Sequence, residues 1–175
     1  MTAHQGFAVW ITGLPASGKS SITREFTQEL VAREVPVVAL ESDEMRKILT
    51  PEPTYRDEER DTFYRKLVFT GELIARFGVN VVFDATANKR AYRDHARSLI
   101  HNFIEVFVDC PLEVCMKRDP KGIYGRAVSG KASSVPGLQT AYEPPLRPEL
   151  TLYCQTAPRD NAMAIIRGLK ELRYI

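Results

Sequence analysis

The segment Gly13 to Ser20, GLPASGKS, constrains this chain most, because it joins an apolar run at residues 7–12 to a helical pattern from Ser21 to Arg33. The spacing G-x-x-x-x-G-K-[ST] between a predicted strand and a predicted helix is typical of a phosphate-binding loop. Its glycines let successive backbone N–H groups turn toward an anion, and the helix N-terminus adds partial positive charge. The sequence therefore predicts that the chain binds a nucleoside triphosphate.

The predicted loop also assigns roles to side chains. Lys19 is expected to reach the β- and γ-phosphates of ATP, and the Ser20 hydroxyl is expected to ligate Mg²⁺. The residues expected to hold the nucleotide here are Gly13, Leu14, Pro15, Ala16, Ser17, Gly18, Lys19, Ser20 and Ser21. The loop predicts ATP and Mg²⁺ as cofactors, but it does not identify the group that receives the phosphate.

Apolar runs alternate with helical patterns along all 175 residues, which predicts one α/β domain, residues 1–175, with the three-layer fold of P-loop NTPases. Strands of a five-stranded parallel sheet are expected at residues 7–12, 36–40, 79–84, 103–109 and 150–154. Helices are expected at residues 21–33, 57–77, 89–101, 112–118 and 161–172, with a short one ending at Leu49. Ligands are expected at the carboxyl ends of the strands.

The stretch of residues 119–148 has no visible period and is rich in glycine, proline and basic residues. A stretch of this length without periodicity inside a compact domain is typical of a functional loop. We therefore expect residues 119–148 to form a lid over the nucleotide.

The composition narrows the possible partners. A net charge of +2 does not indicate a nucleic-acid or membrane partner, and no apolar run approaches the ~20 residues needed to cross a bilayer. The stretch Met1 to Gly6 is too short and polar for a signal peptide. Cys110, Cys115 and Cys154 are odd in number and form no C-x-x-C pair, so we expect buried thiols in a reducing compartment. These features together predict a cytoplasmic protein that binds a small-molecule nucleotide.

Two acidic residues follow predicted strands at the expected ligand edge. Asp43 could orient and deprotonate an attacking hydroxyl or take part in the Mg²⁺ site, and the alternative is a helix N-cap. Three residues on, Arg46 could bind an anionic acceptor. Asp84 could support Mg²⁺ or simply end its strand in a turn. The acidic residues 57–59, in contrast, are expected to form a solvated first turn of a helix.

Basic residues lie at the start of the predicted lid. An arginine in this position can stabilise the charge that develops during phosphoryl transfer, and Arg118 is the strongest candidate. Lys121 and Arg126 follow it, and a solvated basic loop is the alternative for all three. After the last strand, Ala157 is placed near the adenine ring by its position alone.

Several segments resemble the adenylylsulfate (APS) kinase family. The run Phe103 to Tyr124, which contains R-D-P-K-G-I-Y, is similar to that family, as is A-Y-E-P-P at residues 141–145. Together with the phosphate loop, the resemblance covers nearly the whole chain. It implies an enzyme that uses MgATP to phosphorylate the ribose 3′-hydroxyl of adenylyl sulfate, usually as a homodimer.

The resemblance also implies an acceptor side, on which the chain departs from the family. The residues implied to bind the acceptor are Asp43, Arg46, Tyr55, Arg60, Thr86, Lys121 and Leu138. The family stacks the acceptor adenine between two phenylalanines, whereas this chain has Tyr55 and Val135 there, and Thr62-Phe63 replaces a Glu-Asn pair. Loss of one stacking ring is expected to weaken binding by about 1 kcal/mol or more.

Two alternatives remain open at this point. Ser42-Asp43-x-x-Arg46 and residues 84–88 also look like small kinases that phosphorylate hydroxyls of other nucleotide-like acceptors, such as polynucleotide ends. A nucleotide-dependent regulatory protein that has lost transfer is the third possibility. The presence of Lys19, Ser20, Asp43 and Arg118 argues against that last alternative.

Overall fold

The computed structural model describes residues 5–175, so residues 1–4, most of the N-terminal stretch considered above, lie outside the described part. Five parallel strands form one sheet in the order β2-β3-β1-β4-β5. The strands are β1 (Ala8–Thr12), β2 (Val37–Glu41), β3 (Asn80–Asp84), β4 (Phe103–Asp109) and β5 (Leu150–Tyr153). This arrangement confirms the predicted five-stranded parallel sheet.

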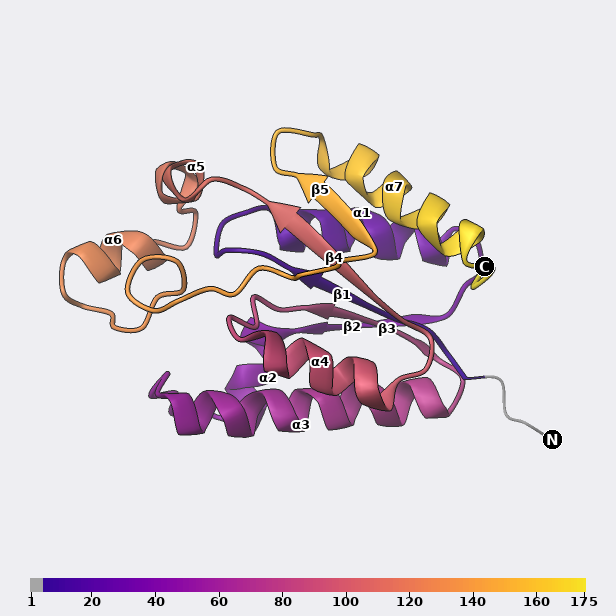
Figure 1. The fold of residues 1–175 in the computed structure, drawn as a ribbon, viewed down its shortest axis with the longest axis horizontal. Coiled ribbons are helices and arrows are strands. Elements are labelled where there is room, and N and C mark those ends of the chain that lie inside the picture. Colours follow the sequence, from indigo (N-terminus) through magenta and orange to yellow (C-terminus); the bar gives the residue numbers. More distant parts are fainter. Residues whose placement is uncertain (1–4) are drawn as a thin grey trace.

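Helices cover both faces of the sheet, as Figure 1 shows. One face carries α1 (Lys19–Val31) and α7 (Pro158–Glu171), and the other carries α2 (Ser42–Leu49), α3 (Asp57–Arg76) and α4 (Arg90–Leu99). Two short helices, α5 (Leu112–Arg118) and α6 (Ile123–Val128), lie beyond the carboxyl ends of the strands. The three-layer fold is therefore confirmed.

Two details of the helix prediction after residue 118 were wrong. Helix α6 forms in the stretch for which no element was expected, and the Asp119 carboxylate holds its start by accepting hydrogen bonds from the N–H groups of Tyr124 (3.2 Å) and Gly125 (2.8 Å). Helix α7 begins at Pro158 rather than Asn161. Proline suits a first helical turn, whose N–H groups need no helical partner, and it carries no apolar period.

Strand β1 is buried along its whole length and separates the two main apolar clusters. Trp10 packs with the α3 and α4 side, where its ring stacks on Phe83 with centroids 4.5 Å apart and its Nε1 donates to the Ala85 carbonyl at 3.1 Å. Val9 and Ile11 face the α1 and α7 side. Because both faces of β1 are packed, the loop that follows it starts from a fixed point.

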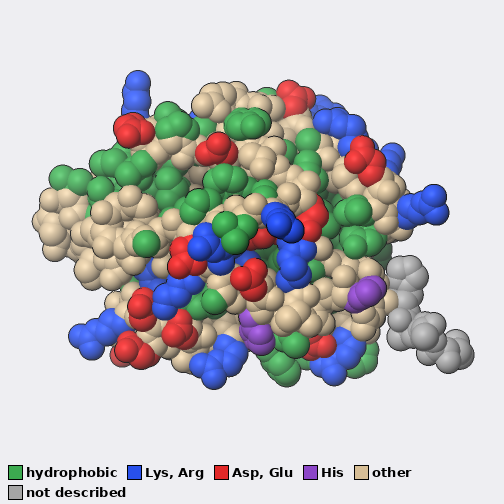
Figure 2. All heavy atoms as spheres, viewed as in Figure 1, with side chains coloured by type: hydrophobic (Ala, Val, Ile, Leu, Met, Phe, Trp, Pro, Cys, Tyr) green, Lys and Arg blue, Asp and Glu red, His purple; other side chains and the backbone are tan. Residues whose placement is uncertain are grey.

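We call residues 119–148 the lid segment. Its last part is bonded to α4. The buried Arg93 donates to Glu105 at 2.6 Å and to the Glu143 carbonyl at 2.6 Å. Arg97 makes two hydrogen bonds to the Glu149 carboxylate, at 2.6 and 2.9 Å. In the view of Figure 2, Lys and Arg side chains lie close to Asp and Glu side chains in the middle of the visible face of the molecule. These bonds fix the point at which the lid segment returns to the sheet.

The three cysteines lie close together in the fold. Cys110, Cys115 and Cys154 are all free thiols and all buried, as expected, and they lie in one small cluster under the lid segment. Within residues 5–175, no helix combines the length and the apolarity that a membrane span requires.

Candidate active site

The loop between β1 and α1 adopts the backbone conformation of an anion-binding cradle. Gly13, Ala16 and Gly18 have φ values of 153°, 61° and 107°. A Cβ on Gly13 would lie 2.7 Å from the Val108 carbonyl oxygen, so the loop can approach β4 this closely only with glycine. Since α1 begins at Lys19, the free N–H groups of its first turn face the loop. This geometry suits the phosphates of a nucleotide.

Lys19 lies inside this loop. Its Nζ donates hydrogen bonds to the carbonyl oxygens of Gly13 (3.1 Å) and Leu14 (2.8 Å). Burial lowers the pKa of the Lys19 ammonium from its ordinary value, and the carboxylate of Asp84 acts in the opposite direction. An ammonium held in a dry, donor-rich loop interacts more strongly with a phosphate than one in water does.

A cavity of about 1010 Å³ opens at the carboxyl ends of the strands and brings most of the predicted site residues together. Three walls enclose it. The nucleotide wall consists of Pro15, Ala16, Gly18, Lys19, Ser20 and Ser21. The acceptor wall contains Asp43, Arg46, Tyr55, Arg60, Asp84 and Thr86. The lid wall contains Arg118, Lys121, Arg126 and Val135. The cavity is therefore bounded by the phosphate loop on one side and by the predicted acceptor residues on another.

Asp43 bridges the acceptor wall and the lid wall. It is the second residue of α2, whose N-cap position is Glu41, so the N-cap alternative is not what the structure shows. Its Oδ2 accepts a hydrogen bond from Lys121 Nζ at 2.5 Å, and this bond raises the pKa of Lys121. Both side chains are more than half exposed, so they can exchange this contact for a ligand at little cost in stability.

Asp84 lies deeper, at the end of β3. Burial raises the pKa of its carboxyl group, while the Lys19 ammonium and the Ser20 hydroxyl beside it act in the opposite direction. Carboxylate and hydroxyl oxygens are the ligands that Mg²⁺ prefers, usually one or two of them together with phosphate oxygens. Within residues 5–175, no group of three or more His, Cys, Asp or Glu side chains could hold a metal ion alone. The oxygen groups of Ser20, Asp43 and Asp84 thus fit a magnesium ion that is also held by a bound nucleotide.

Arg118 ends α5 and lines the cavity. Its Nη2 donates a hydrogen bond to the Cys154 carbonyl at 2.8 Å, which ties the guanidinium to the end of β5. The remaining N–H groups of a guanidinium anchored in this way are left for a ligand. Arg118 therefore has a fixed place at the entrance of the lid segment.

Tyr55 and Arg46 form the core of the acceptor wall. The Arg46 guanidinium lies 3.9 Å from the centroid of the Phe63 ring and 5.0 Å from that of the Tyr55 ring. Phe63 replaces an asparagine of the resembled family. It is fully buried, and its ring packs against the Arg46 guanidinium. Val135 is also buried and lines the cavity, but it offers no ring to a nucleobase.

Arg60, expected to bind the acceptor, has three of its nitrogens committed to protein oxygens. Its Nε donates to the Tyr55 carbonyl at 2.9 Å, its Nη1 to Asn88 Oδ1 at 3.0 Å, and its Nη2 to the Ser134 carbonyl. These partners come from the loop before α3, from the segment after β3 and from the lid segment. Arg60 therefore joins the acceptor wall to the lid wall, and it has fewer free donors than the sequence suggests.

Some predicted site residues lie away from the main cavity. Leu138 is 38% exposed and lies in the turn beyond Val135, and Ala157 is exposed at the N-cap position of α7. Neither lines the cavity in the described part of the chain. Leu14 faces a second cavity of about 340 Å³ and contacts the turn that contains Gly137. A contact of Leu138 or Ala157 with a ligand would require that ligand to extend beyond the main cavity.

Sequence reasoning missed some residues of the site. Glu41, Lys131 and Ser134 line the cavity, although no motif or period marks them. Glu59, expected to be a solvated residue of a first helical turn, is bonded to Arg46 and to the N–H group of Tyr55. The only sequence signal for it was its position one residue before Arg60.

Comparisons with known proteins point to one family. A family model described as adenylylsulphate kinase matches residues 5–153. The adenylyl-sulfate kinase of Rippkaea orientalis is 38% identical over 175 residues, which cover 98% of this chain and 96% of that protein. The adenylyl-sulfate kinase of Gloeothece citriformis is 37% identical over 173 residues, covering 98% of each chain.

A solved structure gives the same result for the fold. The structure of the Mycobacterium tuberculosis APS kinase in complex with AMPPNP and APS is similar with a TM-score of 0.90 at 30% sequence identity. The match covers 95% of this chain and 98% of that one. The similarity thus extends over the sheet, the phosphate loop and the lid segment together.

Proposed function

The chain belongs to the adenylylsulphate kinase family, and we propose that its main cavity is where ATP and adenylyl sulfate meet for phosphoryl transfer. The reaction moves the γ-phosphoryl group of ATP to the ribose 3′-hydroxyl of adenylyl sulfate. The observation that carries the assignment is the main cavity of about 1010 Å³, with the phosphate loop on one wall and Tyr55 with Arg46 on another. This volume lies at the upper end of the range that is usual for ligand pockets.

Each wall has a part in this reaction. Lys19 and the loop N–H groups bind the β- and γ-phosphates and stabilise the charge that spreads during transfer. Asp43 orients the 3′-hydroxyl and accepts its proton as the new P–O bond forms and the bond to ADP breaks. Arg118 and Lys121 add positive charge from the lid side, and Tyr55 offers a stacking face to the acceptor base.

We also propose that Mg²⁺ accompanies the nucleotide. Ser20 and Asp43 would hold the ion, and Asp84 would support the site. The ion would neutralise charge on the β- and γ-phosphates and hold them in line with the acceptor. The carboxylate and hydroxyl oxygens already gathered at the phosphate loop support this placement.

The buried free thiols support a reducing compartment, and we propose the cytoplasm.

Calorimetric titration of adenylyl sulfate into the protein preloaded with MgADP tests the acceptor assignment. We expect a dissociation constant in the micromolar range, and binding of AMP that is weaker by about tenfold or more, because AMP lacks the sulfate that cationic groups can bind. An assay of ATP consumption with adenylyl sulfate should then show turnover. CDP serves as the comparator with a different base.

Two substitutions near the acceptor, relative to the resembled family, explain how adenylyl sulfate could fail to bind. Relative to the resembled family, the buried Phe63 behind the acceptor wall replaces a polar residue, and Val135 on the lid wall replaces an aromatic ring. If adenylyl sulfate neither binds nor is turned over while another nucleotide does so, the acceptor is that nucleotide and our assignment is wrong. The nucleotide wall would be unaffected by that outcome.

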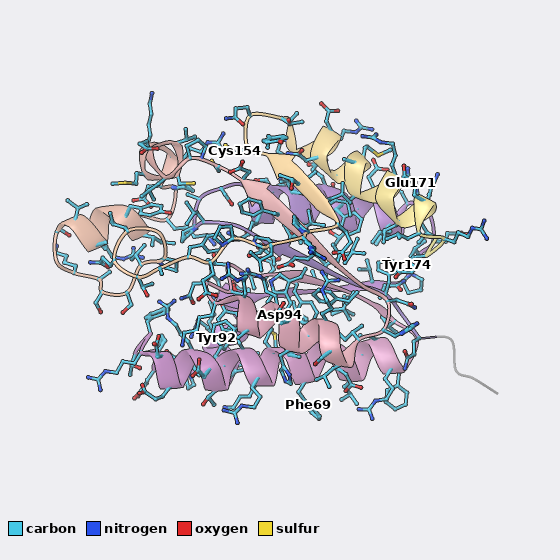
Figure 3. All side chains as sticks on the ribbon, viewed as in Figure 1. Phe69, Tyr92, Asp94, Cys154, Glu171 and Tyr174 are labelled. Atoms are coloured by element: carbon cyan, nitrogen blue, oxygen red, sulfur yellow. The ribbon has the colours of Figure 1, made fainter. Side chains whose placement is uncertain are left out.

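We further propose that two copies of the chain pair through α3. Phe69, Leu73 and Phe77 are 61%, 38% and 78% exposed and follow one another along the outer side of this helix. Phe77 was expected on the buried side, but it lies just past the end of α3. Figure 3 shows Phe69 pointing away from the body of the molecule.

The spacing of the stripe favours a second copy as its occupant. An antiparallel α3 from a partner, crossing at Leu73, would set Phe69 of one copy against Phe77 of the other. Both residues are exposed, and the two-fold operation makes this pairing twice. Isologous contacts of this kind are the commonest route to homodimers.

Replacing Phe69 by glutamate should dissociate the dimer, because it places one charge from each copy within the apolar contact. Sedimentation equilibrium at micromolar concentration measures the result. The matched control is Val31→Glu, since Val31 is 65% exposed on α1 at the other face of the sheet. A wild-type monomer, or a dimer that survives Phe69→Glu, contradicts the proposal.

A further inference from the structure

Tyr55 has a backbone conformation that its side chain disfavours. Its φ is +57°, in the left-handed region, which costs a bulky residue free energy unless the surroundings hold it there. The ring is 43% exposed and lines the main cavity. An exposed aromatic ring on a disfavoured backbone requires an anchor elsewhere, and the structure shows where that anchor is.

Glu59 and Arg60 form hydrogen bonds with the backbone N–H and carbonyl groups of Tyr55. Glu59 Oε2 accepts a hydrogen bond from the Tyr55 N–H at 2.6 Å, and Arg60 Nε donates to the Tyr55 carbonyl at 2.9 Å. Both anchoring residues come from the first turn of α3, which starts at Asp57. The loop before α3 is therefore folded back onto the helix, and this fold sets the direction of the Tyr55 ring.

The same carboxylate holds a second group of the acceptor wall. Glu59 Oε1 accepts a hydrogen bond from Arg46 Nη1, in an ion pair whose side chains are only 14% and 11% exposed. The Phe63 ring lies under the guanidinium, with its centroid 3.9 Å from Arg46 Cζ. Arg46 is thus held between a carboxylate and an aromatic face, which fixes both its position and its plane.

We propose that Glu59 is a positioning residue for the acceptor nucleotide, acting through Tyr55 and Arg46 without touching the substrate. This inference rests on the assignment of this wall to the acceptor. In the described part of the chain, Glu59 is not among the residues that line the cavity. Its two carboxylate oxygens instead link the aromatic group and the cationic group that do line it.

Two effects of Glu59 on an anionic acceptor oppose each other, and their difference makes the proposal testable. The negative charge of Glu59 weakens the attraction of Arg46 for an anion, so removing that charge would by itself lower KM for the acceptor. The positioning effect acts in the other direction, because a free Arg46 and a free Tyr55 must be ordered again by each substrate molecule. The sign of the change in KM shows which effect dominates.

The experiment compares Glu59→Gln with wild type in steady-state assays that vary adenylyl sulfate and ATP separately. We expect KM for adenylyl sulfate to rise by about tenfold, with KM for ATP unchanged and kcat within about twofold. The matched control is Glu58→Gln, because Glu58 is the exposed neighbour in the same helical turn. Calorimetry with adenylyl sulfate and MgADP should show the same loss of affinity.

A second variant keeps the result interpretable. Glu59→Asp retains the charge but shortens the side chain, so it can reach only one of the two partners, and we expect KM for adenylyl sulfate to lie between those of Glu59→Gln and wild type. A lower KM for adenylyl sulfate in Glu59→Gln, or parallel changes in KM for both substrates, would overturn the proposal. If wild type itself does not use adenylyl sulfate, the acceptor assignment has failed instead, and the two failures are distinct.

Discussion

Replacing Lys19 by alanine should lower kcat/KM by about 10³-fold or more, because Lys19 is the only lysine on the nucleotide wall of the described cavity. The ammonium now bonds to the carbonyl oxygens of Gly13 and Leu14, so it is already held inside the loop before a phosphate arrives. A donor held in place beforehand stabilises the developing charge without reorganisation during the reaction. Initial-rate assays with saturating adenylyl sulfate measure the loss.

The stability of this variant should change little. Burial lowers the pKa of Lys19, which means that the folded protein holds its charged form at a cost. Alanine removes this cost together with two hydrogen bonds, so we expect the free energy of unfolding in urea to change by about 1 kcal/mol or less. The matched control is Lys47→Ala on α2, whose Nζ pairs with the exposed Glu44. Wild-type turnover in Lys19→Ala would rule out the phosphate-loop assignment.

The strand, loop and first helix of the nucleotide wall could be predicted from the sequence because their signals are local. The apolar run, the glycines and the lysine lie within residues 7–33, and each acts on its immediate neighbours. The predicted start of α1 was nonetheless two residues late, at Ser21 rather than Lys19. The difference arises because the last two residues of the motif already have helical geometry.

The acceptor wall could be located by resemblance, but its internal bonds could not. Arg60 was expected to bind substrate, whereas its guanidinium also bonds to Asn88 and to the Ser134 carbonyl, which are 28 and 74 positions away. No periodicity encodes contacts between such distant residues, because they form only when the sheet brings the segments together. Glu59 was overlooked for a related reason, since an acid in a first helical turn usually faces water.

The lid segment shows the limit of periodicity in another way. Helix α6 has only six residues, and Asp119 holds its start through side-chain bonds to backbone N–H groups. A helix of six residues has too few apolar positions to produce a pattern, so absence of a period did not mean absence of a helix. Arg93 and Arg97 of α4 bond near the other end of this segment, and periodicity does not indicate such contacts because they join distant residues.

Replacing Asp43 by asparagine should lower kcat by about 10²- to 10³-fold while KM for ATP stays near the wild-type value. Asparagine keeps the size of the side chain, but it cannot accept the proton of the 3′-hydroxyl. The side chain is 62% exposed and its ion pair with Lys121 is also exposed, so stability in urea should be unchanged within about 0.5 kcal/mol. Glu44→Gln, at the next position of α2, is the matched control.

The ion pair with Lys121 offers a different explanation for any loss, namely that Asp43 only holds the lid wall closed. Lys121→Gln separates the two roles, because it breaks the same 2.5 Å contact and leaves the carboxylate in place. It also removes the positive charge that Lys121 adds from the lid side, so its loss of kcat is an upper limit for the lid role. If Asp43 only held the lid wall, Lys121→Gln would lose at least as much kcat as Asp43→Asn, and the double variant would be no worse than Lys121→Gln. If Asp43 accepts the proton, Asp43→Asn should lose at least about tenfold more kcat than Lys121→Gln, since only that substitution removes the base. We expect the second outcome, because an exposed pair contributes little to holding two segments together, whereas a carboxylate at the reacting hydroxyl acts in every turnover.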